Sequence, residues 1–210
     1  MNNSVVNTAR LLGAGLRALL VLTLLTGVLY PLAVTGVAQA LFHDKANGSE
    51  VRADGRVVGS SLIGQQDYGP GYFQPRPANG LGTNSVNTRY KLVLSGATNL
   101  SADNPQLIKS VKQAKAEVVR ENSTARYKVS PSQVPADAVT SSGSGLDPDI
   151  SPQYADLQVH RVAEKNGLSV ARVQKLVDDH TEHRTLGFIG EPRVNVLELN
   201  VALRAVLAKS

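Results

Sequence analysis

The chain has 210 residues, of which 42% are hydrophobic and only 4% aromatic, enough for one ordinary domain but not for platforms that stack on nucleic-acid bases. Its formal charge is +5, and beyond Arg10 and Arg17 it carries 20 basic and 17 acidic residues. This dispersed balance predicts no nucleic-acid partner, because such binding needs clustered basic residues. There is no cysteine, which excludes disulfide and thiol chemistry.

The first predicted element is a transmembrane helix over residues 18–42, a run without any charged side chain. At about 1.5 Å per residue this run can cross a hydrocarbon core of roughly 30 Å with some tilt. Gly27 and Pro31 lie inside it, and both residue types are common in membrane helices. The length and the composition therefore predict one membrane span.

The charges on either side of this run predict its orientation. Arg10 and Arg17 precede it, so the positive-inside rule places residues 1–17 in the cytoplasm. Residues 43–210 then form an extracytoplasmic, periplasmic domain on a single-pass protein of the inner membrane.

A cleaved signal peptide is the alternative. Ala38-Gln39-Ala40 fits the small residues before a cleavage site, but the apolar run is about twice the usual length of a signal core. Cleavage would leave a soluble periplasmic binding protein or hydrolase that starts after Ala40. The length of the run favours the anchor.

The span lacks ionisable side chains and is therefore not expected to line an ion path. Thr23 with Gly27, and Gly36 with Ala40, form small-residue pairs four positions apart, at which another helix can approach closely. Exposure of both pairs to lipid is an equally good interpretation, since such pairs are frequent by chance.

The domain begins with a predicted hairpin over residues 50–63, in which Asp54-Gly55 is the turn between two β-prone runs. Residues 64–102 are rich in Gly, Pro, Asn and Ser and show no periodicity. A loop of that length is usually functional or ordered by a partner.

Four helices follow, separated by another loop over residues 121–150. Their N-terminal caps are predicted at Asn104, Ser151, Ser169 and Asn195, and Gly167 is the predicted end of the second helix. Each helix has a predicted inward-facing apolar stripe. The stripes are Leu107, Ile108, Val111, Val118 and Val119 in the first helix; Ala155, Val159, Val162 and Ala163 in the second; Val170, Val173, Leu176 and Val177 in the third; and Val196, Leu199, Leu203 and Val206 in the fourth. The predicted fold class is α+β: one N-terminal transmembrane helix and a single mixed domain with long ordered loops.

The sequence lacks the motifs of nucleotide hydrolysis. It contains no G-x-x-x-x-G-K-[ST] loop, no G-x-G-x-x-G after a strand and no Asp-Lys-Thr-Gly run of the kind phosphorylated in P-type ATPases. We therefore predict that the chain is not an enzyme by itself, with no catalytic residues.

Two constellations contain residue types of chemical sites. His180 and His183 lie three apart on the third predicted helix, but a closed metal site needs three or four ligands, so a solvated helix end is favoured and no metal is predicted. Ser144, Asp147 and His160 include the residue types of a hydrolytic triad, but the G-x-S-x-G nucleophile elbow is missing. A turn-forming loop is the favoured interpretation of the glycine-serine run.

Two loops could present backbone N–H groups to phosphate: Leu94-Ser95-Gly96 and the Ser141–Gly145 run. The signal is weak, and tight turns are the favoured interpretation of both.

Several short stretches occur together in one consistent order between residues 16 and 204. They are Tyr30-Pro31-Leu32, Gly59-Ser-Ser-Leu-Ile-Gly-Gln65, Gly71-Tyr-Phe-Gln-Pro-Arg-Pro77, Ser95-Gly-Ala-Thr-Asn-Leu100, Asn104-Pro105, Ser142-Gly-Ser-Gly-Leu-Asp-Pro148, Ile150-Ser-Pro-Gln153, Gly187-Phe-Ile-Gly-Glu-Pro-Arg-Val-Asn-Val196 and Leu199-Asn200. As an ordered set they resemble the potassium-transporting ATPase C chain of the Kdp system. The sequence departs from that pattern only locally, at Ala97 and Asp149.

The resemblance implies a membrane complex for potassium uptake. In this family the partners are a channel-like potassium-translocating subunit and a P-type ATP-hydrolysing subunit, and the C chain is a non-catalytic accessory subunit needed for assembly. In this family the C chain has also been proposed to raise the affinity of the ATP-hydrolysing subunit for ATP. No tightly bound cofactor is expected, and ATP is expected only in that context. The predicted orientation, however, places the loops of residues 64–158 across the membrane from cytoplasmic ATP.

The mechanism we favour from the resemblance is a cap, in which the exported domain lies over the potassium entrance and holds the channel-like subunit. Motif residues would then order loops or contact that partner, and stabilisation of their own fold is an equally good interpretation for each. These residues are Gln65, Tyr72, Phe73, Arg76, Asn99, Gln153 and Arg193.

Overall fold

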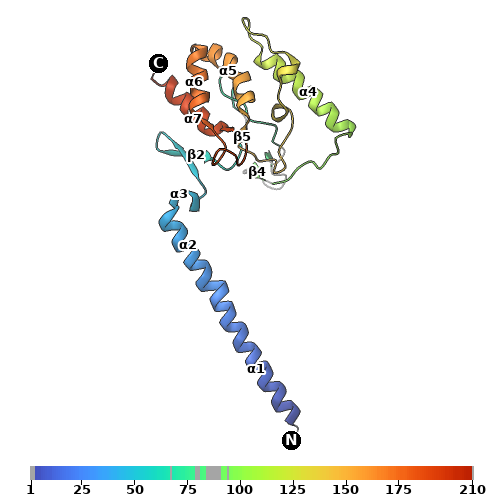
Figure 1. Ribbon diagram of the computed structural model, residues 1–210, viewed down its shortest axis with the longest axis vertical. Coiled ribbons are helices and arrows are strands. Elements are labelled where there is room, and N and C mark those ends of the chain that lie inside the picture. The colour runs from blue at the N-terminus through green and yellow to red at the C-terminus, as the bar shows by residue number, and fades with distance from the viewer. Residues whose placement is uncertain (1–2, 67, 79–80, 84–90, 94, 210) are drawn as a thin grey trace. The chain divides into compact units, whose positions relative to one another are not determined.

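The computed structural model of the chain consists of two units, Met1–Ser49 and Glu50–Ser210 (Figure 1). The described residues are 3–66, 68–78, 81–83, 91–93 and 95–209. Leu94, which belongs to one of the two loops considered for phosphate contact, lies outside them.

The N-terminal unit is one long helix followed by a short one. The long helix consists of α1 (Asn3–Leu24), a π-helical turn η1 (Leu25–Leu29) and α2 (Tyr30–Leu41), and α3 (His43–Ala46) follows. The stretch Ser4–Leu41 is long and apolar enough to cross a membrane, and none of its most apolar part is buried by the chain itself. The helix thus begins well before residue 18, while the limits of the bilayer-embedded part stay a prediction.

The π-helical turn has a local cause at Pro31. Proline has no N–H group to donate, and its ring clashes with the carbonyl four residues earlier, here that of Gly27. The N–H group of Tyr30 instead bonds the carbonyl of Leu25, five residues back. The wider turn keeps the backbone hydrogen-bonded next to a residue that interrupts the regular α-helix.

The folded domain begins with an antiparallel hairpin of β1 (Glu50–Ala53) and β2 (Arg56–Ser60). Asp54 and Gly55 both have positive φ angles, 51° and 74°, as a tight two-residue turn requires. The predicted hairpin and its turn are confirmed.

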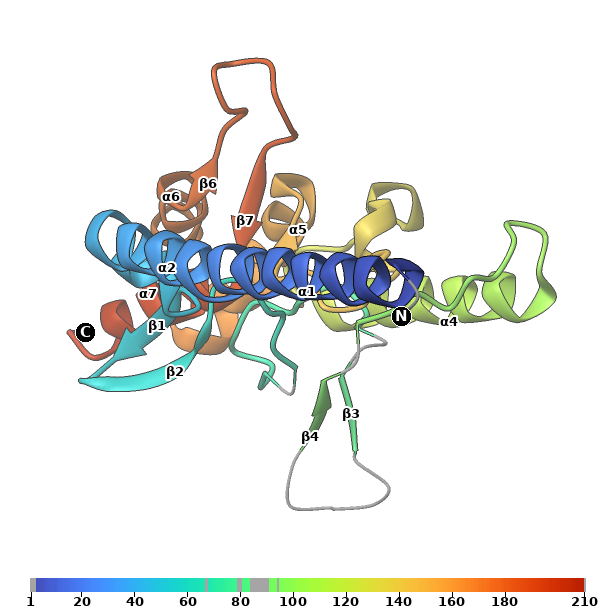
Figure 2. The same cartoon turned by 90° about the horizontal axis from the view of Figure 1, so that it is seen from below.

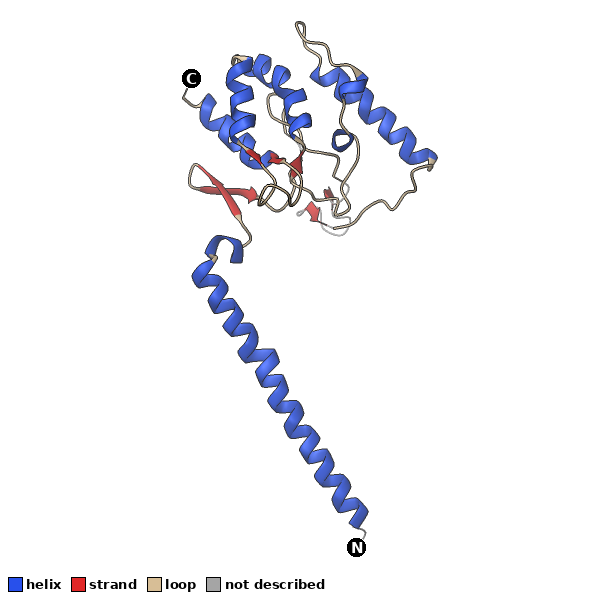
Figure 3. Ribbon diagram, in the orientation of Figure 1, coloured by secondary structure: helices blue, strands red, loops and turns tan. Residues whose placement is uncertain are grey.

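Two further sheets are built from very short strands (Figure 3). The first pairs β3 (Leu81–Thr83) with β4 (Lys91–Val93), so the predicted loop over residues 64–102 contains a short hairpin that its lack of periodicity did not indicate. The second has the order β5-β7-β6 and is antiparallel throughout. Its strands are β5 (Asp149–Ile150), β6 (Thr181–Glu182) and β7 (Arg193–Asn195).

Four α-helices supply most of the remaining regular structure of the described domain. They are α4 (Pro105–Asn122), α5 (Pro152–Asn166), α6 (Val170–Asp179) and α7 (Val196–Leu207), with 3-10 turns η2 (Pro131–Gln133) and η3 (Ala136–Ala138) between the first two. All four predicted caps are confirmed, since each cap side chain accepts from an N–H group of the first helical turn. Gly167 ends α5 with a φ angle of 65°, also as predicted.

The core forms around α5, which lies between α4 on one side and α6 with α7 on the other in both views (Figures 1 and 2). All four residues predicted to face inward from α5 are buried, as are Val173 and Val177 of α6. Three of the four predicted for α7 are buried, namely Val196, Leu199 and Leu203. The fold is thus mixed helix and sheet, with one long apolar N-terminal helix and a following ordered domain, as predicted.

The predicted inner faces of α4 and α6 need correction. Within α4, which is described throughout, Val118 is the only apolar residue in the buried core, and Ile108 is 40% exposed. The N-terminal half of α4 extends past the other helices, so its apolar stripe has little to pack against (Figure 1). Val170 of α6 is 41% exposed because it lies in the first, peripheral turn.

Candidate functional site

The loop that contains Gly71–Pro77 lies against the core, with Phe73 buried and the other residues of this stretch half-buried. Phe73 has no exposed surface and belongs to the same cluster of buried side chains as Leu199 and Leu203 of α7. A loop in this position must satisfy its backbone polar groups without a neighbouring strand.

Side-chain amides take the place of that strand. Asn200 of α7 accepts from the N–H of Phe73 and donates to its carbonyl, both at 2.9 Å. Gln158 of α5 does the same for Gln74, accepting at 2.7 Å and donating at 3.1 Å. Each amide thus holds both polar groups of one residue, as a paired β-strand would.

Arg161 of α5 fixes the beginning of the same loop. Its guanidinium group donates to the carbonyls of Pro70 and Tyr72, to Asn122 of α4 and to Gln158. Only 3% of the residue is exposed, and this burial lowers the pKa of Arg161 from its ordinary value. A buried cation is tolerated where its donors are hydrogen-bonded, as they are here.

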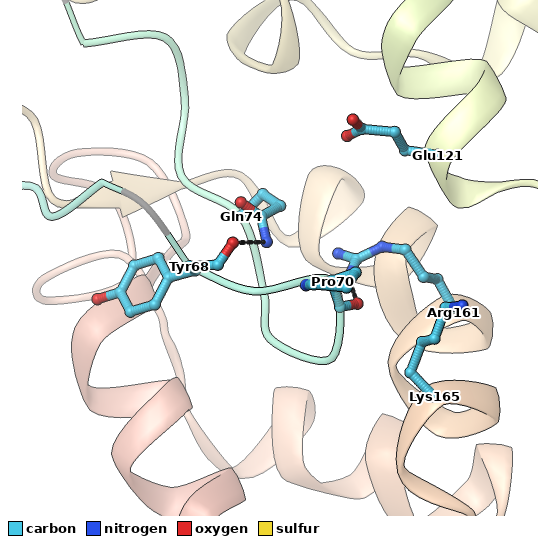
Figure 4. A pocket seen from close by; sticks show the side chains of 6 residues that line it. All are labelled: Tyr68, Pro70, Gln74, Glu121, Arg161 and Lys165. Atoms are coloured by element: carbon cyan, nitrogen blue, oxygen red, sulfur yellow. Dashed lines mark hydrogen bonds between the residues drawn. The ribbon is translucent and has the colours of Figure 1, made fainter.

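A pocket of about 300 Å³ opens beside Arg161 (Figure 4). It is lined by Tyr68, Pro70, Gln74, Glu121, Arg161 and Lys165. Glu121 comes from α4, whereas Arg161 and Lys165 come from α5, and Gln74 donates to the carbonyl of Tyr68 at 3.2 Å. The lining thus combines the buried Arg161 with the charged side chains of Glu121 and Lys165.

The loop of residues 142–148, called the central loop below, joins three other motif segments. The N–H of Gly64 donates to the carbonyl of Leu146 at 2.7 Å, and the N–H of Gly96 donates to that of Ser144 at 2.7 Å. Arg76 forms an ion pair with Asp147 at 2.8 Å. Stretches from 59–65, 71–77 and 95–100 therefore meet at one loop.

The contact at Gly64 also explains why this position is a glycine. A Cβ atom there would lie 2.7 Å from the carbonyl oxygen of Asp147, closer than real Cβ atoms approach. The two backbones can lie this close only without a side chain at Gly64.

Backbone N–H groups of the central loop are used within the protein. The N–H of Gly145 donates to the Ser142 hydroxyl at 2.9 Å, and that of Leu146 donates to the Ser144 hydroxyl at 3.2 Å. These bonds, with that of Gly96, favour the interpretation of both glycine-serine loops as tight turns rather than phosphate cradles.

The three residue types of a hydrolytic triad do not come together. Asp147 pairs with Arg76, Ser144 lies 3.1 Å from the Ser142 hydroxyl, and His160 stacks on Tyr127 with ring centroids 3.8 Å apart. These three side chains form no relay from a carboxylate through a histidine to the serine.

The positions of His180 and His183 also differ from the prediction. The third helix ends at Asp179, so His180 caps α6 while His183 lies beyond β6, and the prediction that both lie on one helix was wrong. The helix stops there because the chain turns into the strand that pairs with β7. Within the described residues, no group of three His, Cys, Asp or Glu side chains could hold a metal ion.

Arg193 on β7 connects two strands of its sheet. It forms ion pairs with Glu182 of β6 at 2.6 Å and with Asp149 of β5 at 3.1 Å. Asp149 also accepts from the Asn195 amide at 3.1 Å. Burial raises the pKa of the Asp149 carboxyl, and the attraction of Arg193 opposes that shift.

The remaining predicted site residues lie at separate places. Gln65 and Tyr72 line one pocket of about 220 Å³, and the exposed Gln153 lines another of about 300 Å³. Asn99 is exposed and has a positive φ angle of 53°. The structure thus brings Gln65 and Tyr72 together, but not the whole predicted set. A contact of any of these residues with a partner stays a prediction.

Sequence reasoning missed the residues that hold the Gly71–Pro77 loop. Gln158 and Arg161 are polar residues surrounded on α5 by buried apolar ones, and Asn200 has the same setting on α7. Polar side chains on the core-facing side of a helix must have partners, and this was the available signal.

The described residues contain one candidate membrane span, the exposed apolar helix, and one ordered domain. This combination defines a class of proteins that have a membrane anchor and a folded domain. A family model described as "K+-transporting ATPase, c chain" matches residues 12–205. The chain belongs to this family, which confirms the resemblance found in the sequence.

Relatives named "Potassium-transporting ATPase KdpC subunit" match along nearly the whole chain. One from Streptomyces avermitilis is 72% identical over 222 aligned positions, covering 100% of both chains. One from Streptomyces coelicolor is 68% identical over 220 positions, covering 99% of this chain and 98% of that one. One from Mycobacterium tuberculosis is 46% identical over 188 positions, covering 90% and 94%.

Family membership makes this chain a KdpC-type subunit of a K+-transporting ATPase. The alternative of a signal-cleaved soluble binding protein or hydrolase is not favoured.

Proposed function

We propose that the chain is a non-catalytic accessory subunit that assembles and stabilises the ATP-driven potassium-uptake complex. The observation that carries the proposal is the exposed apolar helix Ser4–Leu41 in a chain that matches the C-chain family over almost its full length. A helix with no buried apolar surface of its own is stabilised by lipid or by other membrane helices.

The proposed orientation follows from the charges at the two ends of the span. Arg10 and Arg17 lie on the N-terminal side, which favours a cytoplasmic N-terminus and an extracytoplasmic domain at residues 43–210. The protein is then a single-pass protein of the inner membrane.

The proposed partners are the channel-like potassium-translocating subunit and the P-type ATP-hydrolysing subunit. The pairs Thr23 with Gly27 and Gly36 with Ala40 offer surfaces where a partner helix can approach closely, and the rest of the span faces lipid. The folded domain acts as a cap over the potassium entrance.

In this proposal ATP binds the ATP-hydrolysing subunit of the complex and not this chain. The chain itself holds no tightly bound cofactor, and any increase in the ATP affinity of the catalytic subunit is transmitted across the membrane by helix contacts. In the proposed orientation, direct contact between the domain and cytoplasmic ATP is physically excluded.

Co-expression with both larger subunits tests the accessory role. The affinity-tagged chain is expected to bring down both subunits from detergent extracts, and purification without either would overturn the proposal. Tyr72→Ala and Arg76→Ala test the predicted interface residues, since intact assembly and transport in these variants would remove them from it.

Cysteine labelling in intact cells tests the orientation. The chain has no cysteine, so Ser4→Cys and Lys165→Cys each introduce a single thiol at an exposed position. A membrane-impermeant maleimide is expected to label the Lys165→Cys variant and to spare the Ser4→Cys variant. The reverse pattern would contradict the proposed orientation.

A further inference from the structure

The connection between β6 and β7 extends away from α5 and α6 (Figure 2). Leu186, Phe188 and Ile189, called the apolar tip below, are 79%, 70% and 51% exposed. Large side chains exposed together at the end of a projecting loop mark an interaction site more often than isolated ones do.

The apolar tip is held in one conformation by its own backbone. Thr185 and Ile189 exchange two hydrogen bonds, at 2.9 and 3.0 Å, and the N–H of Gly187 donates to the carbonyl of Arg184 at 3.0 Å. Leu186 has a positive φ angle of 55°, which is unfavourable for a leucine and has to be maintained by this turn. The tip is therefore preorganised, so little conformational entropy is lost when it binds.

The charged groups below the tip are paired with each other. Arg184 forms an ion pair with Glu191 at 2.6 Å, and Arg193 forms one with Glu182 at 2.6 Å. A negatively charged lipid surface is recognised by an excess of Lys and Arg, which these balanced pairs do not provide. An apolar surface next to polar groups that are already neutralised is instead the composition of a protein interface.

We propose that the apolar tip inserts into an apolar pocket on the extracytoplasmic surface of a membrane-embedded subunit of the potassium-transporting ATPase. This inference rests on the proposed function and adds the contact surface to it. Residues 42–49 link the span to β1 and extend over about 30 Å at most, so the domain stays close to the membrane-embedded subunits. This tether raises the effective concentration of the tip at such a pocket.

Thiol protection tests the contact in the full-length chain. Phe188→Cys and Ile189→Cys place a single thiol in the apolar tip, and Ile108→Cys is the matched control on an exposed part of α4. The rate of maleimide labelling is measured by mass spectrometry of this chain, alone in detergent and in the purified complex. Both tip thiols are expected to react at least 10-fold more slowly in the complex, while the control reacts at the same rate in both.

A second variant measures the strength of the contact. Phe188→Ala is expected to weaken binding of the chain to the partner subunits about 30-fold, as for a buried aromatic residue at the centre of an interface. Ile108→Ala should bind as the unchanged chain does. Equal melting temperatures of the two variants show that the domain remains folded.

Four outcomes would overturn the inference. Rapid labelling of both tip thiols in an intact complex would contradict it and leave the accessory role standing. Protection in nanodiscs of phosphatidylethanolamine and phosphatidylglycerol without partner subunits would assign the tip to lipid. Protection that rises with the concentration of the chain alone would assign it to a second copy. Failure of the unchanged chain to co-purify with the larger subunits would overturn the proposed function and this inference together.

Discussion

Asn200 and Phe73 are 127 positions apart in the sequence, yet the side chain of one holds both backbone polar groups of the other. Asn200 is 4% exposed and Phe73 is not exposed at all, so water is not available to replace these two bonds. This pair fixes the Gly71–Pro77 loop to α7, and with it the position of Phe73 in the core.

Asn200→Ala is expected to lower the free energy of unfolding by about 2–4 kcal/mol, because it leaves two buried backbone groups without partners. Urea unfolding of the full chain in detergent measures the change. Gln153→Ala, at an exposed position, is the control and should stay within about 0.5 kcal/mol. Similar stability of the two variants would show that the loop is held by packing alone.

The ion pair of Arg76 with Asp147 is expected to couple the motif loop to the central loop. Their side chains are 19% and 30% exposed, so water screens the pair only in part. Arg76→Met, Asp147→Asn and the double variant form a cycle with an expected coupling of about 1 kcal/mol in the free energy of unfolding. The exposed pair of Lys175 with Asp179, measured in the same way, should couple more weakly, because water screens both charges. Equal coupling in the two cycles would contradict the structural role of Arg76.

Pro31→Ala is expected to convert η1 into regular α-helix. Alanine supplies the missing N–H group and removes the ring that clashes with the carbonyl of Gly27. Backbone chemical shifts of the chain in micelles report the change at Leu25–Leu29. Leu32→Ala is the control, because it keeps Pro31 in place and should leave the π-helical turn intact. Persistence of that turn in Pro31→Ala would show that another residue causes it.

Asp149→Asn is expected to change the pH dependence of stability. Burial raises the folded-state pKa of Asp149 above the ordinary value of 3.8. A raised carboxyl pKa favours folding while the group is protonated, and this contribution is lost as pH rises through the folded-state pKa. The stability of the Asn variant relative to the unchanged chain should therefore increase between about pH 3 and pH 6.

Unfolding curves measured across that pH range test the assignment. Asp156→Asn, on the exposed side of α5, is the control. The pH dependence of its stability should be closer to that of the unchanged chain than the pH dependence of Asp149→Asn is. A relative stability of Asp149→Asn that falls as pH rises would show that the attraction of Arg193 outweighs burial.

Local signals in the sequence were sufficient to predict much of the fold. Asn104, Ser151, Ser169 and Asn195 each cap a helix because a short polar side chain next to the first turn can reach its free N–H groups. The Asp54-Gly55 turn was predictable for a similar reason, since both residues tolerate a positive φ angle. These features depend on neighbours within a few positions.

The site was less predictable because its contacts are distant in sequence. Phe73 was predicted among the loop residues that order their segment or reach a partner, and nothing near it in sequence indicates Asn200 as its bonding partner. The strands β5, β6 and β7 have two or three residues each, too few for a periodic pattern. The exposure of Ile108 likewise depends on where α4 extends relative to the other helices, which its own amphipathic pattern does not contain.

The side chains that hold the Gly71–Pro77 loop have a consequence for the folding of the chain during its synthesis. The loop is made early, but Gln158, Arg161 and Asn200 are synthesised much later, so its backbone remains hydrated until α7 has emerged. Closing such long chain segments is slow. Nascent chains that stop before α7 should therefore lack a formed core and be degraded rapidly, whereas chains that include α7 should acquire resistance to proteases in one late step.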